Sequence, residues 1–166
     1  MTLAEFTRGF DDHHLALFRF ACRLTGSAAD AEDIVQECFL ALLRADCGFD
    51  PRRTHLRTYL FGAVRNQASK RFRRREDATG EVEAPPDLRS PESEVLRGEM
   101  QACVARAVLE LPETQREILI LSHYEQMPLA EIAEVVGLEV GAVKSRLQRA
   151  RGALREMLAE YQERLP

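Results

Sequence analysis

Two blocks of basic residues are the parts of this sequence best suited to bind a charged ligand. Residues 51–75 contain nine Arg and Lys side chains and no acid, and residues 140–155 contain five and no acid. The remainder of the chain is acidic, because the net charge of all 166 residues is −4. Guanidinium and ammonium groups bind phosphate oxygens, so two such blocks in an acidic chain indicate two separate contacts with a polyanion.

The sequence contains no recognisable catalytic or metal-binding pattern. Its four His residues are scattered, its four Cys residues show no CxxC spacing, and it has no phosphate-binding Gly-rich loop or nucleophile elbow. A metal or redox site would require these side chains to meet through folding alone. We therefore expect no enzyme and no cofactor. Beyond reduced thiols we assign no role to the cysteines, which are Cys22, Cys38, Cys47 and Cys103.

Composition argues against secreted and membrane-spanning classes. Apolar residues make up 45% of the chain and charged residues 30%, an ordinary balance for a globular protein. No apolar run approaches the roughly 20 residues that a membrane span requires. The first residues lack the basic start and apolar stretch of a secretory signal, so we expect a cytoplasmic protein.

Apolar residues recur at intervals of three and four, which predicts helices and no strands. Gly26 is an expected helix stop and Ser27 the next N-cap. The predicted helices cover residues 12–24, 28–43, 56–74, 94–111, 112–122, 128–136 and 140–161. Residues 76–94 contain three prolines among acids and small side chains, the composition of a flexible linker. The predicted fold is all-α, with small helical domains at 1–75 and 95–166.

Residues 129–143 carry the pattern of a DNA-reading helix-turn-helix. Ala133 is small where two helices cross, Gly137 suits a left-handed turn, and Val143 points back to the core. An ordinary helical hairpin with a solvated basic face is the alternative. Glu139 is a poor N-cap and faces incoming phosphate, which predicts weak DNA binding by this domain alone. The expected DNA contacts of the second helix are Lys144, Ser145, Gln148 and Arg149, with Arg146 and Arg151 nearby.

Aromatic residues are interleaved with the first basic block, at Tyr59, Phe61 and Phe72. Aromatic rings in a cationic groove stack on unpaired bases, but rings at helical spacing are more often part of a core. We favour the core interpretation for most of them.

The motifs together resemble bacterial sigma factors of the extracytoplasmic-function (ECF) group. Residues 23–39, 49–52 and 56–75 are similar to the second conserved region of that group. Residues 111–121, the helix-turn-helix and residues 143–155 are similar to its fourth region. The resemblance covers nearly the whole chain and implies an RNA polymerase sigma factor that binds core RNA polymerase and directs promoter-specific initiation of transcription.

The resemblance also implies roles for individual residues. Docking on the clamp helices of the polymerase β′ subunit falls to Asp33, Gln36 and Glu37. Recognition and melting of the −10 element fall to Arg57, Tyr59, Arg65, Asn66, Lys70, Arg73 and Arg74. Binding of the −35 duplex is expected of the six residues named above, at positions 144, 145, 146, 148, 149 and 151. Further expected partners are the polymerase β flap and an anti-sigma factor. The family's pocket for a flipped −10 base maps loosely onto residues 46–56.

Two features depart from the family pattern, and two other functions stay open. Tyr59 stands where members commonly have Trp, and Ser69 lies near a position that is commonly acidic; both departures bear on the preference for the −10 sequence. A decoy that binds only an anti-sigma factor would be expected to lose its basic blocks. A stand-alone helix-turn-helix regulator would need a dimerisation surface, and no coiled-coil pattern is visible.

Overall fold

The first part of the chain forms a bundle of three helices. The computed structural model describes residues 2–44, 47–78 and 95–163. The bundle consists of α1 (Leu3–Thr25), α2 (Ala28–Leu42) and α3 (Leu56–Ala78). α1 packs against both α2 and α3. Phe20 of α1 and Phe61 of α3 are both fully buried, and their ring centroids lie 5.1 Å apart. This aromatic contact lies in the core of what we call the N-terminal bundle.

α1 begins earlier than the sequence predicted, at Leu3 instead of residue 12. Thr2 is its N-cap, and its hydroxyl accepts a hydrogen bond from the Glu5 amide while the Glu5 carboxylate accepts one from the Thr2 amide. This capping box satisfies amides that a helix end leaves unpaired. The apolar periodicity did not reveal the added turns because they are mostly exposed.

Two predicted helix boundaries are confirmed and one is shifted. Gly26 ends α1 in a left-handed conformation with φ of 70°, and the Ser27 hydroxyl accepts a hydrogen bond from the Asp30 amide at the start of α2. α3 continues to Ala78, past the predicted end at residue 74, because no Gly or Pro interrupts it before Gly80. The remainder of the predicted linker, residues 79–94, lies outside the described residues.

Four helices form the second bundle, which we call the C-terminal bundle. They are α4 (Val95–Glu110), α5 (Glu113–His123), α6 (Leu129–Val136) and α7 (Val140–Glu163). α4, α5 and α6 each pack against α7. All seven helices in the described part of the chain match predicted ones, and no strand occurs there, so the all-α prediction is confirmed. No helix among the described residues is long and apolar enough to cross a membrane.

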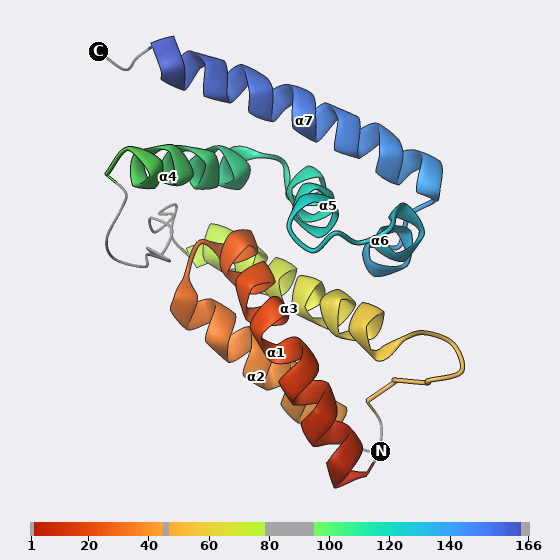
Figure 1. Ribbon diagram of the computed structural model, residues 1–166. Coiled ribbons are helices and arrows are strands. Elements are labelled where there is room, and N and C mark those ends of the chain that lie inside the picture. The colour runs from red at the N-terminus through yellow and green to blue at the C-terminus, as the bar shows by residue number, and fades with distance from the viewer. Residues whose placement is uncertain (1, 45–46, 79–94, 164–166) are drawn as a thin grey trace.

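The two bundles lie against each other, an arrangement that the sequence did not predict. α3 contacts α6, and α1 contacts α4 and α5 (Figure 1). Gly62 of α3 faces α6, where a Cβ atom on this glycine would lie 3.9 Å from the Val135 carbonyl oxygen. The buried apolar side chains of both bundles form one continuous cluster. The basic helix α3 therefore lies at the interface between the bundles.

Candidate functional site

The turn before α7 has the geometry of a helix-turn-helix. Gly137 ends α6 with φ of 68°, and the Leu138 amide donates to the Ala133 carbonyl across the turn at 3.1 Å. A positive φ of this size strains any residue with a Cβ atom. Ile132 and Val143 are fully buried on the two sides of the turn. The glycine turn and the inward position of Val143 are both as the sequence predicted.

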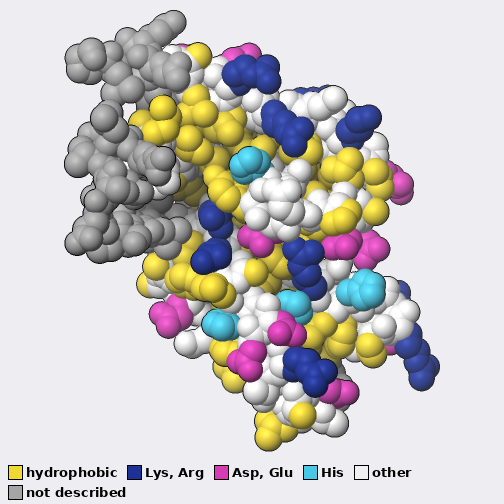
Figure 2. All heavy atoms as spheres, viewed as in Figure 1, with side chains coloured by type: hydrophobic (Ala, Val, Ile, Leu, Met, Phe, Trp, Pro, Cys, Tyr) yellow, Lys and Arg dark blue, Asp and Glu magenta, His cyan; other side chains and the backbone are white. Residues whose placement is uncertain are grey.

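α7 presents one buried and one polar side. Val143, Leu147 and Ala150 are buried against the C-terminal bundle. Five of the six residues predicted to contact the −35 duplex are exposed on the other side and Arg146 is half-buried; the exposed five are Lys144, Ser145, Gln148, Arg149 and Arg151. Lys and Arg side chains stand out along the edge of the molecule that α7 forms in Figure 2. This side of α7 carries donors for phosphate and base edges and no acid before residue 156.

The residues predicted to bind the −10 element separate into two groups. Leu60, Val64 and Ala68 bury one side of α3. Four predicted contacts are exposed and lie toward the C-terminal half of the helix: Asn66, Lys70, Arg73 and Arg74. The other three, Arg57, Tyr59 and Arg65, are half-buried. The structure therefore does not present these seven side chains as one open surface.

Tyr59 holds the loop that precedes α3. Its hydroxyl donates a hydrogen bond to the Cys47 carbonyl, and its ring lies 5.2 Å from the ring of Phe49. Burial raises the pKa of Tyr59, so the hydroxyl keeps the proton that it donates. In the same loop the Asp50 carboxylate accepts from the Arg52 amide at 2.9 Å. Tyrosine is thus a packing anchor here, in keeping with the core interpretation of the interleaved rings.

Arg65 pairs with a buried carboxylate of the other bundle. Its Nε donates to Oε2 of Glu117 on α5 at 2.8 Å, and the Glu117 side chain is only 2% exposed. Burial raises the pKa of Glu117, while the hydrogen bond and charge of Arg65 act in the opposite direction. An ionised carboxylate at such depth needs a cation close by. The Arg65 guanidinium is that cation, and it comes from α3, the helix predicted to bind DNA.

Arg57 also contacts the C-terminal bundle, at α6 and the loop that precedes it. Its Nη2 donates to the Glu125 carbonyl oxygen at 2.9 Å, and its Nη1 lies 3.5 Å from Oε2 of Glu131 on α6. Both side chains of the ion pair are 36% exposed, so the pair is weaker than that of Arg65. Two predicted promoter contacts therefore have protein partners.

The three residues predicted to dock on polymerase lie together on the exposed side of α2. Asp33, Gln36 and Glu37 are all exposed, and Ile34 and Cys38 on the opposite side are buried. Arg71 of α3 reaches this surface, with Nη2 3.0 Å from Glu37 Oε1 and Nη1 3.5 Å from Asp33 Oδ2. The acidic face is therefore linked to the basic helix within the N-terminal bundle.

Residues of α5 that join the two bundles were not predicted from the sequence. Arg116 Nη1 donates to the Leu24 carbonyl oxygen of α1 at 3.0 Å, and its guanidinium carbon lies 5.3 Å from the ring centre of Phe72. The next residue, Glu117, accepts the hydrogen bond from Arg65. The burial of Glu117 could have been predicted from the sequence. It precedes Leu121 by one helical turn, so helical periodicity places it on the buried side of α5.

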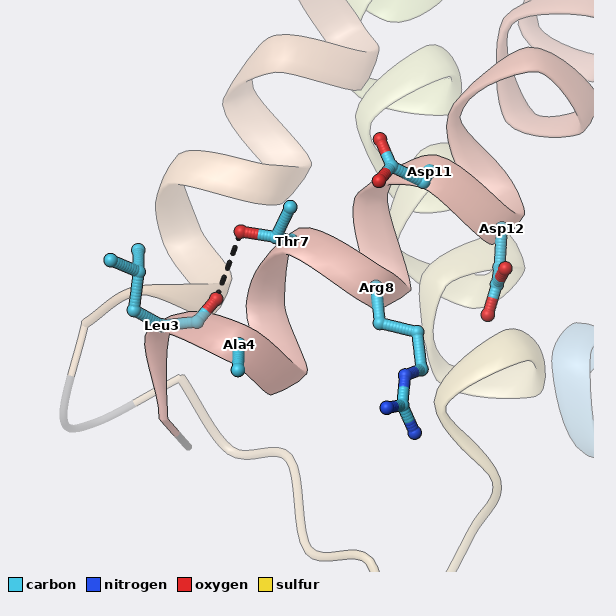
Figure 3. Close-up of a pocket in the computed structure, with 6 residues that line it drawn as sticks. All are labelled: Leu3, Ala4, Thr7, Arg8, Asp11 and Asp12. Atoms are coloured by element: carbon cyan, nitrogen blue, oxygen red, sulfur yellow. Dashed lines mark hydrogen bonds between the residues drawn. The ribbon is translucent and has the colours of Figure 1, made fainter.

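A shallow depression on α1 offers no comparable chemistry. Figure 3 shows its lining residues along one exposed side of the helix, with the Thr7 hydroxyl bonded to the Leu3 carbonyl oxygen at 3.0 Å. Arg8 and Asp11 point in different directions there, so no set of polar groups converges. No group of His, Cys, Asp and Glu suited to a metal ion occurs among the described residues.

Comparison with known proteins accounts for both bundles. Residues 10–77 match the family described as Sigma-70 region 2, and residues 101–154 match Sigma-70, region 4. The ECF RNA polymerase sigma factor SigL of Mycobacterium tuberculosis is 35% identical over 156 residues, covering 91% of this chain and 87% of SigL. The chain belongs to the ECF RNA polymerase sigma factors. Like other sigma factors of this group, it binds core RNA polymerase and directs initiation of transcription at promoters.

Other similar proteins agree with this assignment. The ECF sigma factor SigW of Bacillus subtilis is 28% identical to this sigma factor, covering 87% of the chain and 83% of SigW. Among solved structures, RpoE of Bartonella quintana in complex with the anti-sigma factor NepR has a TM-score of 0.76 and 26% identity, covering 95% of this chain and 98% of RpoE. CnrH in complex with the cytosolic domain of CnrY has a TM-score of 0.73 and 27% identity, covering 96% of this chain and 90% of CnrH. The ECF resemblance noted in the sequence is confirmed.

Proposed function

We propose a division of labour in which each bundle makes one promoter contact and α2 makes the polymerase contact. α7 enters the major groove of the −35 duplex, α3 binds the melted −10 strand, and Asp33, Gln36 and Glu37 dock on the β′ clamp helices. The observation that carries this proposal is α7: Val143, Leu147 and Ala150 are buried and the polar residues between them are exposed. An exposed polar face on the second helix of a helix-turn-helix is how such motifs read DNA.

Two weak contacts joined in one complex give useful specificity. A second contact on the same scaffold becomes intramolecular, so its effective concentration rises without any new interaction. Core polymerase would supply that scaffold by holding the two bundles at the spacing of the promoter elements. The energy that opens DNA would come from binding, since we propose that the chain itself catalyses no reaction and needs no cofactor.

We also propose an anti-sigma factor as a protein partner and the cytoplasm as the place of action. Both solved structures named above are complexes of a sigma factor with such a partner. Their TM-scores over nearly the whole chain support a comparable complex here.

Run-off transcription tests the proposed function. Purified core polymerase is incubated with and without this chain on a promoter library, and the transcripts are sequenced. We expect start sites that appear only when the chain is present, with shared −35 and −10 elements upstream. Identical transcripts in both reactions would exclude a sigma factor activity and favour a decoy. Tight binding of the chain alone to a duplex operator would favour a stand-alone regulator.

A further inference from the structure

Arg71 is a residue of the basic helix α3 whose side chain faces α2 within the N-terminal bundle. It is half-buried, whereas Lys70, the residue before it, is exposed. Nη2 of Arg71 lies 3.0 Å from Glu37 Oε1. Nη1 lies 3.3 Å from Asp30 Oδ1 and 3.5 Å from Asp33 Oδ2. One guanidinium of the basic block 51–75 is therefore paired with three carboxylates of α2.

The three carboxylates differ in how deeply they lie. The side chain of Asp30 is only 15% exposed, so this residue holds Arg71 from the buried side. Asp33 and Glu37, about one and two helical turns further along α2, are 64% and 51% exposed. Burial by itself disfavours the charge of Arg71, but the carboxylates around it outweigh that effect and raise its pKa. The two outer carboxylates are thus open to a partner while one cation holds both.

Such a cation prepares exposed carboxylates for binding. An exposed Asp or Glu side chain samples several rotamers, and ordering it on association costs free energy. The guanidinium group is planar and presents its donors in a fixed fork, so it fixes the positions of the carboxylates it binds relative to one another. It also offsets the repulsion between like charges one helical turn apart. A surface held in this way loses less freedom when a partner docks.

We propose that Arg71 is a positioning residue for polymerase docking, which holds the carboxylates of Asp33 and Glu37 in the arrangement that the clamp helices bind. The inference rests on the proposed docking role of this face of α2. It separates Arg71 from the exposed cations of α3, which the proposed function assigns to DNA. Arg71 acts on docking through the two carboxylates and not through a contact of its own with polymerase.

Loss of Arg71 has two opposite effects, which makes the sign of the result informative. Without this cation the docking surface is more negative, and charge alone would then speed association with a partner that binds carboxylates and tighten the complex. Loss of positioning weakens the complex, and such effects of interface changes appear mainly in the dissociation rate. A weaker complex that dissociates faster therefore indicates positioning, and a tighter complex indicates charge alone.

Binding of the full-length chain to immobilised core polymerase, followed by surface plasmon resonance, tests the role of Arg71. We expect Arg71→Gln to bind about fivefold more weakly or more, with faster dissociation and no slower association. Arg71→Lys keeps the charge but lacks the planar fork, so its affinity should lie between those of Arg71→Gln and wild type. Arg44→Gln is the control, because it removes the same charge from an exposed residue just beyond α2. It should bind no more weakly than wild type.

A double-mutant cycle shows whether Arg71 acts through Glu37. Glu37→Gln is combined with Arg71→Gln, and the effect of losing Arg71 is compared in the two backgrounds. With Glu37 already neutral, we expect the loss of Arg71 to weaken binding by no more than about twofold, because only Asp33 is still held for docking. A general destabilisation of the bundle would instead weaken both backgrounds equally.

The outcomes separate the positioning role from the proposed docking face. If Glu37→Gln weakens binding while Arg71→Gln leaves it unchanged or tightens it, the positioning role is overturned and the docking face stands. Equal losses from Arg71→Gln in both backgrounds overturn it as well. If Glu37→Gln itself binds polymerase like wild type, the docking face is wrong and the positioning role is overturned with it.

Discussion

Arg71 of α3 donates a hydrogen bond to Glu37 of α2 across 3.0 Å. Its other terminal nitrogen lies 3.3 Å from Asp30 and 3.5 Å from Asp33. The acidic surface that we propose docks on polymerase is thereby held by the helix that we propose binds DNA. Because Glu37 is 51% exposed, the pair contributes roughly 0–1 kcal/mol and leaves the carboxylate available to a partner.

Glu37→Lys should weaken binding to core polymerase by about tenfold or more, which corresponds to about 1.4 kcal/mol. The change removes a carboxylate that we propose docks on polymerase and places an ammonium group beside Arg71. Surface plasmon resonance with immobilised core polymerase measures the effect. Glu32→Lys is the control, since it makes the same charge change at another exposed position of α2. Equal losses in the two variants would mean that net charge alone governs docking.

Arg149→Ala should reduce discrimination at one position of the −35 element. Loss of a direct base contact costs about 1–3 kcal/mol at the cognate site and little at a mismatched one. Competition binding of the holoenzyme to −35 variants, from a promoter found by run-off, measures this difference. Arg155→Ala removes the same charge from another exposed position on α7. Uniform weakening by both variants, without a change in preference, would assign Arg149 to phosphate.

Gly137→Ala should lower the free energy of unfolding by about 1 kcal/mol or more, because alanine is strained at φ of 68°. A Cβ atom there would meet nothing within 4 Å, so the cost comes from the backbone alone. Gly152→Ala is the control within helix α7, also in open space, and should raise stability by up to about 1 kcal/mol. Urea titration measures both. A stabilising Gly137→Ala would contradict the left-handed turn.

Cys22 and Cys38 should resist alkylation in the folded protein. Both are 3% exposed, and burial raises the pKa of Cys22 to about 11 and that of Cys38 to about 12, from 9.0. Two pKa units reduce the reactive thiolate about a hundredfold at a given pH below the pKa. Iodoacetamide labelling followed by mass spectrometry should modify Cys47 and Cys103 first, since both are partly exposed. Equal labelling rates in the absence of denaturant would contradict this burial.

Local patterns in the sequence were sufficient for the helices and for the helix-turn-helix. Ser27, Gly26 and Gly137 act through their own backbone and immediate neighbours, so their types reveal caps and turns without knowledge of the fold. The inward position of Val143 and the exposed face of α7 follow from helical periodicity in the same way. The first turns of α1 were not predicted from apolar periodicity because they bury little apolar surface.

The sequence by itself determined the helical class, the two basic blocks and the exposed polar face of α7, because each depends on residues within a few turns of one another. Only the tertiary structure decided which charges meet. Arg65 and Glu117 are 52 positions apart and Arg57 and Glu131 are 74 positions apart. No local spacing encodes such pairs, since they arise from how α3 packs on α5 and α6.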